Sequence, residues 1–90
     1  MGLAGVTIEI MPESPETDFE KLKEKLQSVL SKNEAKLLKD EVEPIAFGLK
    51  KLIIIFQWDE AKESEEIVKE VGQIEGIRSC SVTDVRRMIQ

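Results

Sequence analysis

The chain has 90 residues, of which 41% are hydrophobic and 34% charged, with a formal net charge of −5. This length suits one domain with one hydrophobic core. The sequence has no His and a single Cys, which excludes imidazole catalysis, an intrachain disulfide and an all-Cys metal site. Its acidic charge and the lack of a long apolar run argue against nucleic acid or a membrane as the partner. We therefore expect a cytoplasmic protein that acts by binding and needs no cofactor.

The first third of the chain predicts a strand followed by a helix. Apolar and polar residues alternate over residues 6–10, as in a strand with one buried face. Prolines end this strand because they lack a backbone donor. The helix is expected to begin at Thr17 or Asp18, since Thr17 and Glu20 have the spacing of a capping box. Apolar residues then recur every three or four positions until the helix ends near residues 31–33.

Two strands joined by a turn are predicted next. Residues 36–42 carry many charges and alternate poorly, which favours a strand at the edge of a sheet. Turn signals cluster in residues 44–48. Residues 49–58 follow, and their uninterrupted apolar run from Leu52 to Phe56 indicates a strand in the middle of a sheet.

The last third predicts a second helix at about residues 64–73 and a final strand at 77–85, in which Cys80 and Val82 are the expected core contacts. The order of elements is then β-α-β-β-α-β. This order predicts the α+β class and a ferredoxin-like βαββαβ sandwich. Its four-stranded antiparallel sheet would have the strand order 4-1-3-2, with two helices on one face.

This topology predicts two separate ends of the sheet. The turn at residues 44–48 would lie at one end, and residues 84–90 would leave from the other, roughly 20–25 Å away at ~3.3 Å per residue. Phe47 stands beside Gly48 in the turn, and it either packs back over the core or remains outside. Arg86 and Arg87 give the acidic chain one basic end. A guanidinium group can bind a phosphate or a carboxylate through two parallel hydrogen bonds.

Four short motifs follow one another along the chain: MPESP at residues 11–15, PIAFGLKKL at 44–52, IEG at 74–76 and TDVRR at 83–87. Together they resemble the archaeal type of the translation elongation factor 1-beta family. The resemblance covers nearly the whole chain, and the central motif is its most specific part. It implies that residues 1–90 are a single exchange-factor domain, a guanine-nucleotide exchange factor for the GTPase elongation factor 1-alpha rather than an enzyme.

The resemblance also implies partner-binding residues at both ends. In this family the aromatic residue of the central turn contacts the second domain of the GTPase, and that role falls here on Phe47. The other end reaches the magnesium and switch region, where eukaryotic members use a lysine; that position is about Gln90 here. Arg86 or Arg87 is expected to supply the cation instead, unless the backbone alone displaces the switch. We assign partner binding to Phe47, Gly48, Lys50, Lys51, Arg86 and Arg87, and expect a monomer when the protein is free.

Two other functions stay open at this point. One is a ferredoxin-like regulatory or assembly module that binds a small ligand or dimerises through a sheet face containing Ile53 and Ile55. The other is a small enzyme of the acylphosphatase kind, which would need an Arg in the loop after the first strand. Residues 11–18 contain none.

Overall fold

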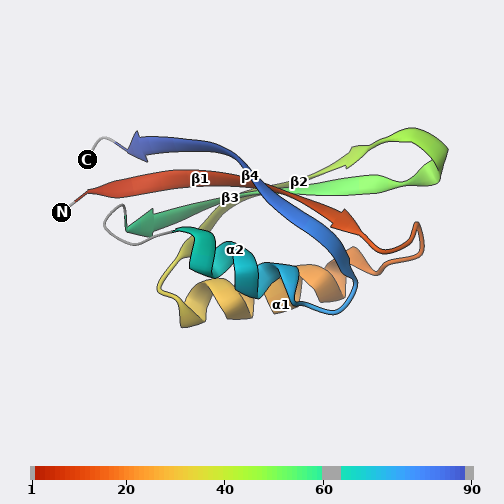
Figure 1. Ribbon diagram of the computed structural model, residues 1–90, viewed down its shortest axis with the longest axis horizontal. Coiled ribbons are helices and arrows are strands. Elements are labelled where there is room, and N and C mark those ends of the chain that lie inside the picture. The colour runs from red at the N-terminus through yellow and green to blue at the C-terminus, as the bar shows by residue number, and fades with distance from the viewer. Residues whose placement is uncertain (1, 60–63, 89–90) are drawn as a thin grey trace.

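The computed structural model describes residues 2–59 and 64–88. Four strands and two helices follow one another in the predicted order (Figure 1). Their bounds are β1 (Leu3–Pro12), α1 (Phe19–Lys32), β2 (Lys36–Pro44), β3 (Lys50–Asp59), α2 (Ser64–Gly72) and β4 (Ile77–Met88). A short 3-10 turn (Ala46–Gly48) joins β2 to β3.

The strands form one sheet in the order β2-β3-β1-β4, and all neighbours are antiparallel. Both helices lie on the same face of this sheet (Figure 1). The predicted ferredoxin-like arrangement is therefore confirmed. β1 and β3 occupy the middle, where apolar strands are expected, and the charged β2 lies at an edge, where its charges discourage unwanted pairing.

The core lies between the helices and the middle strands. Every second residue of β1 and β3 is buried against the helices, because successive side chains of a strand point to opposite faces. Ile8 pairs directly with Ile54 across the two strands. The helices contribute Leu22, Leu26, Leu30, Ile67 and Val71. Ile53 and Ile55, on the face without helices, are only partly buried.

The start of α1 differs from the predicted capping box. Asp18 is the N-cap, and its Oδ1 accepts hydrogen bonds from the backbone N–H groups of Glu20 and Lys21 at 3.0 and 3.4 Å. The Thr17 hydroxyl accepts instead from the N–H of Ser14, at 3.4 Å. A carboxylate is the stronger acceptor for the unpaired donors of a first turn, so Asp18 takes the position that the spacing gave to Thr17.

β4 is longer than predicted, and this corrects two expectations. It continues to Met88, so residues 84–88 lie within the sheet and do not leave it at Asp84. The cause is β1, which already begins at Leu3 and pairs Leu3 with Met88. Val82 is also not a core residue: its exposed fraction is 38%, because β4 is an edge strand with a bulge between Val82 and Asp84. Among residues 77–87 of this strand, Ile77 is the one that is buried.

Candidate partner-binding site

The proposed binding residues lie at opposite ends of the molecule. The β2–β3 hairpin projects from one end, and the start of β1 and the end of β4 lie at the other (Figure 1). Arg86 pairs with Gly5, and Gly5 pairs with Gln57 of β3. The strand from Lys50 to Gln57 spans roughly 23 Å at ~3.3 Å per residue. The predicted separation of the two ends is thus present in the fold.

The hairpin loop presents Phe47 to solvent. The loop is closed by a hydrogen bond from the N–H of Ile45 to the carbonyl of Leu49, at 2.8 Å. Phe47 has φ 62° and ψ 32°, and its exposed fraction is 95%. Gly48 follows with φ 75°, a conformation that glycine adopts freely. For a bulky residue such as Phe47, the same left-handed conformation costs free energy. The high exposed fraction of Phe47 shows that its side chain does not pack over the core.

The two lysines of the central motif have different surroundings. Lys50 is exposed, whereas Lys51 Nζ lies 2.9 Å from Glu9 Oε1 and 3.8 Å from Glu43 Oε2. The hydrogen bond to Glu9 raises the pKa of Lys51 above its ordinary 10.5, so its ammonium group is charged at neutral pH. Sequence reasoning missed Glu9, because alternation gives the face of a strand residue but not its neighbour on the next strand.

Arg86 and Arg87 do not form one basic tip. They pair with Gly5 and Ala4, which are consecutive in β1, so the two arginines point to opposite faces of the sheet. Arg86 lies on the face without helices, where its Nε lies 2.8 Å from Asp84 Oδ2. The exposed fraction of its side chain is still 83%. Gln90, the position expected to replace the eukaryotic lysine, lies outside the described residues.

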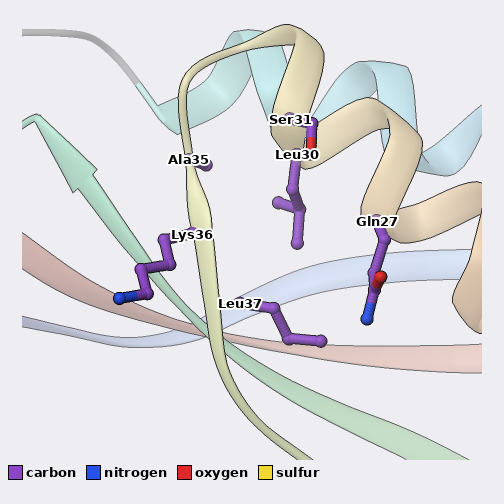
Figure 2. Close-up of a pocket in the computed structure, with 6 residues that line it drawn as sticks. All are labelled: Gln27, Leu30, Ser31, Ala35, Lys36 and Leu37. Carbon is purple, nitrogen blue, oxygen red and sulfur yellow. The ribbon is translucent and has the colours of Figure 1, made fainter.

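A small pocket lies between the end of α1 and the start of β2. Its volume is about 280 Å³, and it is lined by Gln27, Leu30, Ser31, Ala35, Lys36 and Leu37. Figure 2 shows Leu30 and Leu37 entering the space between helix and strand, while Lys36 points away from the helix. Gln27, Ser31 and Lys36 are its polar lining residues. The lining offers no pair of titratable side chains for acid–base chemistry.

Across 2–59 and 64–88, no group of three or more Cys, Asp or Glu side chains is arranged to hold a metal ion. No helix in these ranges is long and apolar enough to cross a membrane. Cys80 is partly buried against the core, and burial raises the pKa of its thiol, which disfavours the reactive thiolate.

Similarity to known proteins establishes the family of this chain. The sequence model of the EF-1 guanine nucleotide exchange domain matches residues 5–88. This chain belongs to that exchange-domain family. Elongation factor 1-beta of Methanothermobacter thermautotrophicus is 40% identical over 90 residues, covering 99% of this chain and 100% of the relative. Elongation factor 1-beta of Nanoarchaeum equitans is 42% identical over 76 residues, covering 83% and 93%.

Members of the EF-1 exchange-domain family promote guanine-nucleotide exchange and are not enzymes. Solved structures of other proteins share the fold at low sequence identity. The C-terminal domain of the MgtC protein from Mycobacterium tuberculosis superposes with a TM-score of 0.70 at 14% identity, covering 91% of this chain and 87% of that one. The ACT domain from GTP pyrophosphokinase of Chlorobium tepidum gives 0.57 at 11% identity, covering 92% and 100%. These likenesses concern the fold alone.

Proposed function

We propose that this chain promotes GDP release from elongation factor 1-alpha in the cytoplasm, so that GTP can rebind during translation elongation. The 90 residues would act as one domain and as a monomer when free. The observation that carries the proposal is the placement of Phe47. An almost fully exposed aromatic ring is held on the tip of a projecting hairpin, at the end of the sheet opposite Arg86.

Phe47 is the proposed anchor at the hairpin end. Exposed aromatic side chains are costly in water and become favourable when a partner supplies an apolar pocket. The left-handed backbone at Phe47 and Gly48 leaves the ring exposed before binding, so the ring need not be released from the core to meet a partner. Gly48 and the exposed Lys50 lie close to Phe47 in the chain and would complete this contact.

The proposed contact at the other end is cationic. Arg86 presents a largely exposed guanidinium, and Arg87 follows on the opposite face of β4. A guanidinium placed near the partner's nucleotide site would bind the acidic groups that hold the magnesium ion, so that GDP would lose the metal contact to its phosphate oxygens. No lysine follows Lys69 in the chain, so arginine is the side-chain cation available at this end.

Exchange then follows from differential binding and needs no covalent step. A protein that binds the nucleotide-free GTPase more tightly than the GDP-bound form must weaken GDP binding by the same factor. A ~10³-fold weakening corresponds to about 4 kcal/mol of differential binding. A few displaced phosphate and magnesium contacts are enough for that difference.

Stopped-flow release of fluorescent mant-GDP from the cognate GTPase tests the proposal. Catalytic amounts of this chain should accelerate release in excess unlabelled GDP. The matched control is the chain carrying both Phe47→Ala and Arg86→Gln, which should accelerate it far less while melting at a similar temperature. Release that stays at the basal rate with excess wild-type protein would refute the proposed function.

A further inference from the structure

The β2–β3 hairpin separates from the rest of the sheet before it reaches its tip. β1 pairs with β3 only as far as Ile10 and Leu52. Beyond Leu52, the residues of β3 pair with β2 alone, up to the pair of Lys50 with Pro44. The end of β1 follows β4 instead, and Figure 1 shows the hairpin and the end of β1 diverging. The outer hairpin is therefore a two-stranded ribbon.

Little packing fixes the direction of this ribbon. Two-stranded hairpins are marginally stable in water and need contact with further strands or helices. Residues 46–48 of the loop are exposed, and Val42 near the base is also exposed. The apolar core ends at Leu52, which is the last buried residue of β3 toward the tip. Any restraint on the ribbon must therefore act near the point where the strands diverge.

Lys51 lies at that point and connects three strands. Lys51 is the neighbour of Leu52 on the side of the hairpin tip. Its ammonium group lies between Glu9 of β1 and Glu43 of β2. Its side chain has an exposed fraction of only 21%. The stem thus crosses the face of the sheet that the helices leave uncovered, and the charged end links the ribbon to β1. A partly exposed ion pair contributes little to overall stability, but this one lies at the base of the ribbon, where a change in strand direction is carried to the tip.

We infer that Lys51 is a positioning residue that holds the hairpin so that Phe47 and the Arg86 end meet the partner together. The inference rests on the proposed function, because it requires that Phe47 contacts the GTPase. It changes the role that the sequence suggested for Lys51, since its ammonium group is engaged by carboxylates of this chain and is not directed to a partner.

The test compares variants on both sides of the ion pair. Lys51→Met keeps the length of the stem and removes the charge, and Glu9→Gln removes the acceptor charge on β1. Each should lower stimulated mant-GDP release roughly fivefold, the scale seen when a connecting residue is changed. Lys51→Arg should retain activity. Lys39→Met is the matched control, because Lys39 makes an ion pair with Glu41 at 2.9 Å within β2, away from the diverging strands.

Combination with Phe47→Ala separates positioning from direct contact. If Lys51 acts by placing Phe47, then Lys51→Met has no further effect on release in the Phe47→Ala background. A full additional loss in that background would show direct contact with the GTPase and overturn the inference. Thermal melts of each variant exclude general unfolding as the cause.

The outcomes also separate this inference from the proposed function. If Phe47→Ala itself leaves stimulated release unchanged, the proposed contact at the hairpin is wrong and the inference falls with it. If Phe47→Ala slows release while Lys51→Met and Glu9→Gln behave like Lys39→Met, then only the positioning role is wrong.

Discussion

Arg86 and Arg87 are neighbours in the chain but lie on opposite faces of the sheet. Arg86 stands beside Gly5 on the face without helices, and Arg87 stands beside Ala4, whose side chain is buried on the helix side. One binding pocket that approaches the sheet from a single side cannot receive both guanidinium groups equally. We therefore expect the two arginines to contribute unequally to nucleotide exchange.

Separate removal of each charge tests this asymmetry. Arg86→Gln should slow stimulated GDP release by about tenfold, corresponding to the loss of one charge-assisted hydrogen bond of ~1.5 kcal/mol. Arg87→Gln should have a clearly smaller effect, and the double variant should resemble Arg86→Gln. The measurement is stopped-flow release at two salt concentrations. Equal losses from the two single variants would contradict the one-sided arrangement.

Phe47 should affect partner binding and stability in opposite ways. Phe47→Gly relieves the left-handed strain and should raise the free energy of unfolding by about 1 kcal/mol. The same change removes the ring, so affinity for the nucleotide-free GTPase should fall ~30-fold, the effect of losing a hot spot worth about 2 kcal/mol. Phe47→Ala should lose affinity without the gain in stability. Thermal melts and titration of the complex measure the two effects, and reduced stability with normal affinity would place the ring in the core.

Cys80 should react slowly in the folded protein. Burial raises the pKa of its thiol from the ordinary 9.0 to about 11. The folded state therefore holds this proton more tightly, so the stabilisation is complete below pH 9 and is lost as the pH rises toward 11. At pH 8 the thiolate fraction should be about a hundredfold lower than in the unfolded chain. Alkylation by iodoacetamide with and without urea measures this ratio; equal rates would contradict the burial of the thiol.

Asp18 should contribute more than Thr17 to the stability of α1. Asp18→Ala removes the acceptor for two backbone donors and should cost about 1 kcal/mol. For a domain of this size that corresponds to a fall of roughly 4–8 °C in Tm. Thr17→Ala is the control, since the Thr17 hydroxyl accepts one long hydrogen bond from Ser14. A larger fall for Thr17→Ala would restore the capping box that the spacing suggested.

Most of the fold could be predicted because its signals are local. Alternation placed the buried face of β1, and the apolar run from Leu52 to Phe56 placed β3 in the middle of the sheet. The charges of β2 indicated an edge strand, and the sheet order followed from topology. The far end of β4 could not be predicted, since Asp84 to Met88 extend only because residues 3–7 of β1 offer them partners. Pairing between distant segments is a property of the assembled sheet.

The same distinction applies to the binding site. By itself, the sequence determined the family motifs, the aromatic residue in the central turn and the basic residues near the C-terminus. The tertiary structure alone decided that Phe47 points into solvent, that Arg86 and Arg87 face opposite ways, and that Lys51 is engaged by Glu9 and Glu43. Residue type and local spacing are written along one chain, whereas the direction of a side chain and the charges beside it depend on strand register, which exists only once the sheet has formed.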